Sequence, residues 1–288
     1  MSKPPRLTLP SVARGYRLST ARGEFAVHEA GEPVRGTALL VPGFTGSKED
    51  FIGLLEPLAT AGYRVVAVDG RGQHESAGPR EEAPYALEEL AQDVLAQAAA
   101  LGAGPVHLVG HSLGGLISRA AVLRDPSAFA SLTLMSSGPA AISQEQQVRT
   151  KLLVAALEAM GHDMPGIWAA MRAQDPEDAV ADSPELAEFL RGRWLATAPE
   201  QLIVTGRVLI SEPDRVEELS RAGLPKLVLS GEVDYAWPVP LMDEMARRLG
   251  AQRVVVPGAE HSPNAESPQV TAGALAAFWD TAGDSRTH

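Results

Sequence analysis

Short apolar segments that end at turn residues recur along this chain, and they restrict the folds that it can adopt. The segments lack the alternation of apolar and polar residues that marks a strand with one solvated face. Short, continuous apolar strands are instead typical of a sheet that is covered on both faces. The segments that we predict as buried strands are 37–41, 64–68, 105–109, 131–135, 226–230 and 253–256.

Segments with helical periodicity separate these strands. In residues 87–101, for example, leucine and valine recur at helical spacing. Alternating strands and helices produce right-handed crossovers, so the order predicts an α/β fold with a mostly parallel, doubly wound sheet. Residues 16–18 and 25–28 predict an antiparallel pair at the edge of this sheet. The other predicted helices are 50–61, 116–123, 241–249 and 270–279.

One long interval, residues 137–223, breaks this alternation. It contains apolar stripes at helical spacing but no convincing buried strand. It follows the strand 131–135, and chain inserted at the carboxyl end of a parallel strand lies where ligands bind. We therefore predict that this segment, called the insertion below, is a helical cap, or lid, and that residues 1–136 and 224–288 form the core domain. A separate helical domain is the alternative.

The length and composition restrict the functional classes. The 288 residues, 45% of them hydrophobic, suffice for one large α/β domain with an insertion. A formal net charge of −11 argues against nucleic acid or an anionic membrane as the main partner. The absence of cysteine excludes disulfides, thiolate catalysis and cysteine metal sites. No segment has the apolar length of a membrane span or a signal peptide, so we predict a cytoplasmic protein. We expect it to be a monomer or homodimer and to act on a small molecule.

The segment from Gly110 to Gly114 reads Gly-His-Ser-Leu-Gly and lies between a predicted strand and a predicted helix. It fits the G-x-S-x-G pattern of a nucleophile elbow, a sharp turn that exposes the serine hydroxyl above the sheet. Strand and helix pass close together there, so side chains two positions before and after Ser112 would collide. The N–H group of Leu113, at the start of the helix, can stabilise an oxyanion. A turn in which the serine only caps the helix is the structural alternative.

A nucleophilic serine needs a base to accept its proton and an acid to orient that base. In this topology both follow the serine in the chain, the acid first. Of the seven histidines, only His261 lies in a strand-end loop late in the chain, although a plain surface-loop role is the alternative. Asp234 follows the strand 226–230, and Glu232 on the same turn is the competing carboxylate. We predict Ser112 as nucleophile, His261 as base and Asp234 as acid.

The loop after the strand 37–41 reads Pro-Gly-Phe-Thr-Gly-Ser over residues 42–47 and is called the oxyanion loop below. Gly43 permits an unusual backbone conformation, which allows the N–H group of Phe44 to point into the site as a second oxyanion donor. A glycine turn capped by Ser47 before a helix is the structural alternative, and both interpretations can hold together.

Taken together, these motifs resemble the α/β-hydrolase fold superfamily over nearly the whole chain. The resemblance rests on the oxyanion loop, which is similar to the family's His-Gly-Phe type; on residues 69–76, which resemble its Asp-x-Arg-Gly-x-Gly-x-Ser segment; on the elbow at 110–115; on the acid loop at 231–238; and on the histidine loop at 258–261. Pro42 departs from the family's histidine, and His74 departs from its second glycine. Asp69 and Arg71 are interpreted as structural. A serine at the elbow, rather than an aspartate, argues against a dehalogenase or an epoxide hydrolase.

The resemblance implies a serine hydrolase of the esterase or lipase type that needs no cofactor and no metal. We expect acyl transfer to Ser112 from a carboxylic ester of small to medium size with some apolar character. The aromatic residues Trp168, Phe189, Trp194 and Trp237 are candidates for substrate contacts, with packing inside the protein as the alternative. Thioester hydrolysis, carbon–carbon bond hydrolysis and perhydrolysis on the same triad remain alternatives, as does a ligand-binding protein of the same fold with low turnover.

Overall fold

The computed structural model describes residues 2–160, 163–173 and 182–284. Over these residues the chain forms one eight-stranded sheet with the strand order β1-β2-β4-β3-β5-β6-β7-β8. β1 and β2 are antiparallel, as are β2 and β4, and the remaining pairs are parallel. This confirms the predicted α/β class and the antiparallel pair at the edge. The strands are β1 (Ala13–Thr20), β2 (Gly23–Ala30), β3 (Gly36–Val41), β4 (Tyr63–Val68), β5 (Val106–His111), β6 (Phe129–Met135), β7 (Lys226–Gly231) and β8 (Gln252–Val256).

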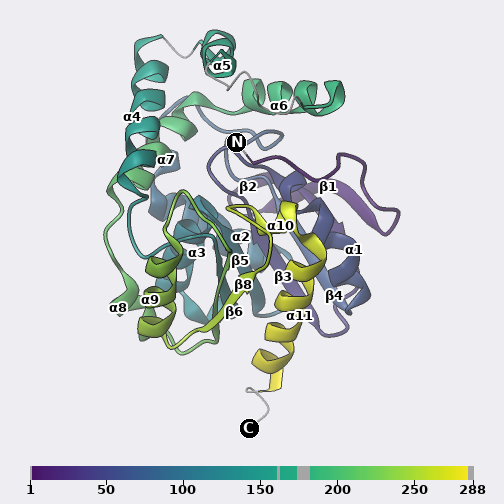
Figure 1. Cartoon of the computed structure of the whole chain (residues 1–288). Helices are drawn as coiled ribbons and strands as arrows, with labels where there is room; N and C mark the ends of the chain where they lie inside the picture. The colour runs from purple at the N-terminus through teal and green to yellow at the C-terminus, as the bar shows by residue number, and fades with distance from the viewer. Residues whose placement is uncertain (1, 161–162, 174–181, 285–288) are drawn as a thin grey trace.

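Helices cover both faces of the sheet, which explains why its strands are continuously apolar (Figure 1). Along β3, Leu39 and Val41 belong to one buried cluster, whereas Ala38 and Leu40 belong to another on the opposite face. The first cluster includes α2 (Leu87–Ala100), α3 (Leu113–Arg124) and α9 (Val239–Leu249), and the second includes α1 (Ile52–Thr60) and α11 (Pro268–Asp284). Shorter elements are η1 (Lys48–Phe51), η2 (Ala83–Tyr85), η3 (Pro126–Ala128) and α10 (Pro263–Glu266).

The insertion lies between β6 and β7, and its described part consists of helices joined by loops. Its elements are α4 (Gln144–Ala159), α5 (Met164–Arg172), α6 (Pro184–Ala196), α7 (Pro199–Ser211) and α8 (Val216–Ser220). Helices α4 to α7 bury a small apolar cluster of their own that includes Leu157, Trp194 and Leu202. Val216 and Leu219 of α8 instead join the main core. The insertion is therefore only partly independent of the core in its packing.

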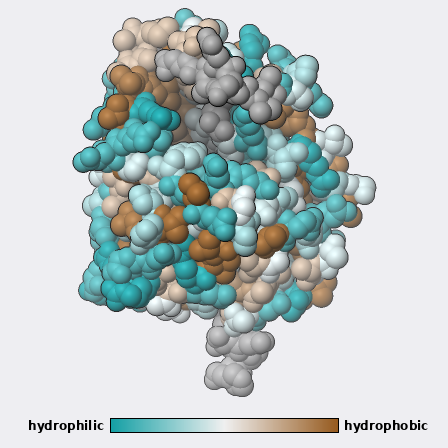
Figure 2. All heavy atoms as spheres, in the orientation of Figure 1, coloured by the Kyte–Doolittle hydropathy of each residue, from teal (hydrophilic) through white to brown (hydrophobic). Residues whose placement is uncertain are grey.

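The exterior of the insertion carries some apolar surface. Figure 2 shows a mostly hydrophilic face with scattered apolar areas, among them one over α4 at the upper left. Val148 and Leu152 of α4 are more than half exposed.

Among the described residues, no helix combines the length and apolar character that crossing a membrane requires.

Candidate active site

Ser112 occupies the sharp turn between β5 and α3, and its backbone has the strained conformation of a nucleophile elbow. Its φ of 54° and ψ of −120° lie in a region that residues with a side chain rarely adopt. A Cβ atom on Gly110 would lie 2.2 Å from the carbonyl oxygen of Gly114, and one on Gly114 would lie 2.3 Å from that of Val41. Glycine is therefore required at both positions, as the sequence predicts.

The Ser112 hydroxyl faces a histidine rather than the helix that it precedes. Its side chain makes no capping hydrogen bond to α3, although Ser112 stands at the N-cap position. Instead, Ser112 Oγ lies 3.1 Å from His261 Nε2, and the serine hydroxyl donates to this nitrogen. The contact joins residues 149 positions apart in the chain. The capping alternative therefore does not describe this serine.

Asp234 fixes the other side of the His261 ring. His261 Nδ1 donates to Asp234 Oδ2 at 2.9 Å, which leaves Nε2 free to accept the serine proton. Asp234 Oδ1 accepts from the N–H groups of Ala236 at 2.8 Å and Trp237 at 3.0 Å, so the carboxylate cannot rotate away. All three predicted triad side chains are buried and form one continuous line of hydrogen bonds.

The competing carboxylate, Glu232, points elsewhere. It is exposed, and its Oε2 accepts from the N–H group of Gly258 at 2.9 Å. Glu232 thus supports the start of the histidine loop without reaching the His261 ring. Of the two acidic residues on this turn, the structure brings Asp234 to the histidine.

His111, next to the serine in the chain, supports the same histidine from behind. His111 Nε2 donates to the backbone carbonyl oxygen of His261 at 2.8 Å, and the two rings lie 5.2 Å apart. Burial, with a smaller contribution from His261, lowers the pKa of His111 to about 4, so the ring is neutral at pH 7. The sequence pattern does not single out His111, because this residue occupies the unrestricted position of G-x-S-x-G.

Of the two residues predicted to supply the oxyanion donors, one is next to Ser112 in the chain and the other follows a glycine that lies close to Ser112. Leu113 follows it as the first residue of α3. Gly43, which precedes Phe44, lies so close that a Cβ atom on it would be 3.2 Å from Ser112 Cβ. The oxyanion loop thus lies against the serine. Ser47 occupies the N-cap position of η1, where its N–H group donates to the Asp50 carboxylate at 3.2 Å.

Comparison with known proteins agrees with this geometry. The family model described as alpha/beta hydrolase fold matches residues 38–268. The chain belongs to the α/β-hydrolase family. It is 30% identical over 226 residues to a pimeloyl-[acyl-carrier protein] methyl ester esterase of Aeromonas hydrophila. That match covers 74% of this chain and 84% of the relative. It is 26% identical over 255 residues to a putative carbamate hydrolase, RutD, of Azorhizobium caulinodans, which covers 85% of this chain and 90% of that protein.

Solved structures extend the comparison. A thermophilic esterase from Thermogutta terrifontis superposes with a TM-score of 0.75 at 26% identity, covering 94% of this chain and 99% of that one. A putative lipase from Acinetobacter baumannii has the same fold, with a TM-score of 0.76 at 22% identity, covering 95% of this chain and 93% of that one. Together with the family match, the esterase relatives identify this α/β-hydrolase as a hydrolytic enzyme.

The aromatic residues considered for substrate contacts fall into two groups in this α/β-hydrolase. Trp194 is buried in the cluster of the insertion and donates to the carbonyl oxygen of Met164 at 2.8 Å. Trp237 is also buried, donates to the carbonyl oxygen of Ala140 at 2.8 Å, and stacks 6.5 Å from the His261 ring. Both indoles are thus buried in this structure and hydrogen-bonded to backbone carbonyl groups.

Trp168 and Phe189 remain partly exposed. The Trp168 ring lies 6.3 Å from Trp194 at the edge of the insertion's cluster. Phe189 of α6 meets the ring of His74 edge-on at 5.5 Å, so it lies where the insertion adjoins the core. These two side chains are better placed to meet a ligand than the buried pair.

His74, which departs from the glycine of the family pattern, has a left-handed backbone. Its φ is 42°, in the region that favours glycine. The turn around it is held at both ends, because Ser76 Oγ donates to the Asp69 carbonyl at 2.9 Å and accepts from the N–H group of Ala26 at 2.9 Å. Arg71 is bound to Asp93 at 2.7 Å, in agreement with a structural role.

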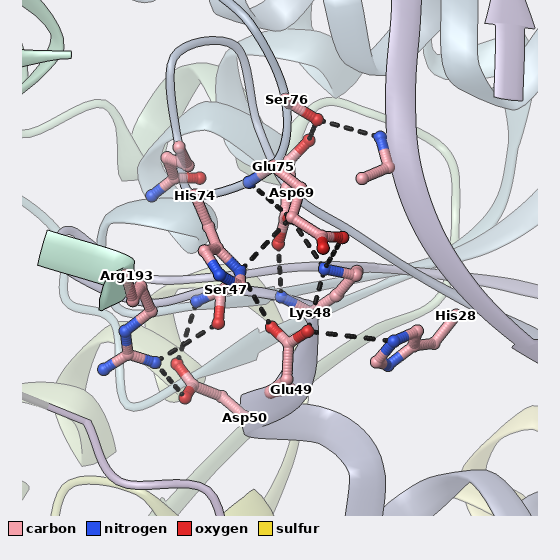
Figure 3. A network of polar contacts seen from close by, with 12 residues as sticks. His28, Ser47, Lys48, Glu49, Asp50, Asp69, His74, Glu75, Ser76 and Arg193 are labelled. Atoms are coloured by element: carbon pink, nitrogen blue, oxygen red, sulfur yellow. Dashed lines mark hydrogen bonds and ion pairs between the residues drawn. The ribbon is translucent and has the colours of Figure 1, made fainter. Parts of the chain in front are cut away.

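A second buried polar group lies beside the oxyanion loop (Figure 3). The Lys48 ammonium contacts Glu49 at 2.8 Å, Asp69 at 2.9 Å and Glu75 at 2.7 Å, and the ring of His74 lies 3.4 Å from Glu49. These five residues are called the Lys48 network below. Burial lowers the pKa of Lys48, but Asp69 and Glu49 more than offset this and hold it above its ordinary value. The lysine is therefore charged at pH 7.

The Lys48 network also contains the one combination of candidate metal ligands found in the described part of the chain. Ligand atoms of Glu49, Asp69 and His74 all lie within 4.8 Å of one another. The Lys48 ammonium already lies between the Glu49 and Asp69 carboxylates and offsets part of their negative charge. A cation of the protein itself thus occupies the position that a metal ion would take, so the set is a structural group rather than an open cation site.

An ion pair next to this network ties the insertion to the core. Arg193 of α6 is buried and contacts Asp50 of η1 at 2.8 Å and Ser47 Oγ at 3.2 Å (Figure 3). Asn264, three residues after His261, donates to the carbonyl oxygen of Asp50 at 2.8 Å. The insertion, the oxyanion loop and α10, which follows the histidine loop, therefore meet at Asp50.

Proposed function

We propose that this α/β-hydrolase is a serine esterase that cleaves a carboxylic ester of small to medium size through an acyl-serine intermediate. The observation that carries the proposal is the unbroken line of hydrogen bonds from Ser112 through His261 to Asp234 at a strained elbow. Such a line gives a weak nucleophile the base and the oriented imidazole that it requires.

In the proposed mechanism, Ser112 Oγ attacks the ester carbonyl while His261 Nε2 accepts its proton. Asp234 stabilises the resulting imidazolium through the bond to Nδ1. The N–H groups of Phe44 and Leu113 stabilise the negative charge on the tetrahedral oxygen. His261 then protonates the leaving alcohol, and water, activated by the same histidine, releases the acid from Ser112.

Two observations support a cap role for residues 137–223. The Phe44 ring packs against the insertion's apolar cluster, so the oxyanion loop and the insertion are in contact. Arg193 and Phe189 of α6 contact loops that follow β3 and β4. We therefore propose that the insertion forms the apolar wall of the substrate site, with residues 1–136 and 224–288 as the core domain. Relatives that are named as esterases favour an ester over the other carbonyl substrates.

The test combines covalent labelling with turnover. Purified protein is treated with a fluorophosphonate, digested and analysed by mass spectrometry, and hydrolysis of p-nitrophenyl esters is followed in parallel. We expect stoichiometric labelling at Ser112 and sustained turnover after any burst. Ser112→Ala abolishes both, whereas Ser118→Ala, a buried serine on α3, preserves both. Labelling at another serine contradicts the nucleophile assignment, and a burst without turnover indicates a binding protein. A panel of esters, thioesters and diketones of matched size then ranks the substrate classes.

A further inference from the structure

The side chain of Gln73 joins the oxyanion loop to the turn after β4. It is buried, with 5% of its surface exposed. Its Nε2 donates to the carbonyl oxygen of Gly43 at 2.8 Å and lies 3.4 Å from that of Phe44. Gly43 O also accepts from the N–H group of Gly46 at 3.2 Å, a longer contact within the loop. Gln73 thus gives this carbonyl its shorter hydrogen bond.

That carbonyl belongs to the same peptide unit as the N–H group of Phe44. The described backbone contains no cis peptide bond, so this unit is planar and trans. In a trans peptide the C=O and N–H bonds point in opposite directions. A donor that fixes the direction of the Gly43 carbonyl therefore fixes the direction of the Phe44 N–H group as well.

The orientation of the Gln73 amide is itself determined by its surroundings. Its Oε1 accepts from the N–H group of Gly70 at 3.1 Å, so the NH₂ end must face the oxyanion loop. A Cβ atom on Gly70 would lie 2.6 Å from this oxygen, so a side chain at Gly70 would displace the amide. The backbone of Gln73 is held by bonds from its N–H group to the carbonyl of Gly70 at 3.0 Å and from Ser76 N–H to its own carbonyl at 2.8 Å.

We propose that Gln73 is a positioning residue for ester hydrolysis, holding the Gly43–Phe44 peptide so that its N–H group faces the developing oxyanion. The inference rests on the proposed function, in which Phe44 is an oxyanion donor. Gln73 touches no reacting atom. Its effect falls on the tetrahedral intermediate and the transition states that flank it, because the substrate oxygen gains its negative charge only there.

Gln73→Met tests this role, because methionine matches the length of glutamine and cannot donate a hydrogen bond. Loss of an oxyanion donor typically lowers kcat about a hundred- to a thousandfold, and a misaligned donor loses part of that. We expect kcat for p-nitrophenyl acetate to fall about ten- to a hundredfold, with KM within about threefold of wild type. Inhibition by a trifluoromethyl ketone, which forms a tetrahedral oxyanion on serine, weakens by the same factor as kcat/KM falls.

The matched control is Gln97→Met, which makes the same change at a buried glutamine of α2 lining the same small cavity as Gln73. It retains kcat within about twofold. Should Gln73→Met not accumulate as folded protein, Gln73→Asn withdraws the amide by one methylene and lowers kcat in the same way. A folded Gln73 variant with wild-type kcat and unchanged ketone inhibition overturns the inference, as does a loss confined to KM. Wild-type protein that neither reacts with fluorophosphonate nor turns over esters overturns the proposed function, and this inference with it.

Discussion

The triad and the Lys48 network each contain a buried aspartate and a histidine at the carboxyl edge of the sheet, yet their hydrogen bonds and ion pairs are arranged differently. In the triad one carboxylate orients one histidine, and the line of hydrogen bonds ends at a hydroxyl group. In the Lys48 network three carboxylates surround a single ammonium. A buried carboxylate thus supports chemistry where its partner can pass a proton to a nucleophile. Where a carboxylate instead forms an ion pair with a buried ammonium, it holds neighbouring loops together.

The most damaging way to break the first arrangement is to change Asp234. Asp234→Asn preserves the shape of the side chain but no longer stabilises the imidazolium or the required His261 tautomer. We expect kcat to fall by roughly 10⁴-fold, as for the corresponding change in other triads, with little change in thermal stability. Glu232→Gln, on the same turn, retains kcat within about threefold. Ester hydrolysis kinetics and thermal unfolding are measured for both variants, and the reverse ranking would move the acid to Glu232.

Breaking the second arrangement affects stability rather than turnover. Lys48→Met leaves three carboxylates without their cation, and removal of one partner from a buried ion pair typically lowers the free energy of unfolding by about 3–5 kcal/mol. Denaturant titration followed by circular dichroism measures this loss. Lys151→Met on the exposed surface of α4 is the control, with a change below about 0.5 kcal/mol. If the folded Lys48 variant loses kcat as severely as the Asp234 variant, the network belongs to the catalytic apparatus and the comparison fails.

Substitutions of Phe44 test how far the catalytic effects extend from the triad, because Phe44 belongs to the oxyanion loop next to Ser112 and the Lys48 network. Phe44→Pro removes the proposed donor and lowers kcat about a hundred- to a thousandfold, or about 2.7–4 kcal/mol. Phe44→Leu keeps the N–H group and retains kcat within about tenfold. Circular dichroism and fluorophosphonate labelling of Ser112 establish first that the elbow is intact in both variants. Equal damage from leucine and proline would assign the effect to the ring.

The smallest expected effect concerns His111. Its ring is buried like the triad, and folding lowers its pKa. The lowered pKa of about 4 means that the unfolded chain binds a proton below about pH 6.5 that the folded protein does not. The stabilising contribution is present above pH 6.5 and is lost as the pH falls towards 4. It amounts to roughly 2 kcal/mol between pH 7.5 and 5. Urea titrations at both pH values measure it, and His111→Gln reduces the difference; an equal difference in that variant contradicts the assignment.

Features that depend on local patterns were predictable from the sequence. The buried strands follow from short apolar runs, and the elbow follows from its glycines, since steric exclusion acts within a few residues of Ser112. The proximity of His261 and Asp234 to Ser112 follows from chain order in this topology. Their positions agree with the prediction, and their catalytic roles stay proposals.

Features that depend on the packing of distant segments were not predictable. Nothing in the sequence around Gln73 indicates that its amide reaches the oxyanion loop 30 residues away. The Lys48 network was missed for the same reason, because Lys48 and Asp69 meet only after folding. The burial of Trp194 and Trp237 likewise depends on segments that pack around them and does not follow from their residue type. Of the seven histidines considered for the catalytic base, His162 and His288 lie outside the described residues.

The backbone of Ser112 has a consequence for how this protein can change over evolutionary time. A residue with a side chain held at a φ of 54° typically costs about 1–3 kcal/mol relative to a relaxed backbone. Glycine would release that strain, so the substitution that destroys the nucleophile is also one that makes the fold more robust. Selection for stability alone therefore drives the elbow towards Ser112→Gly. Stability thus gives no reason for a serine at this position, whereas the proposed role of its hydroxyl group does.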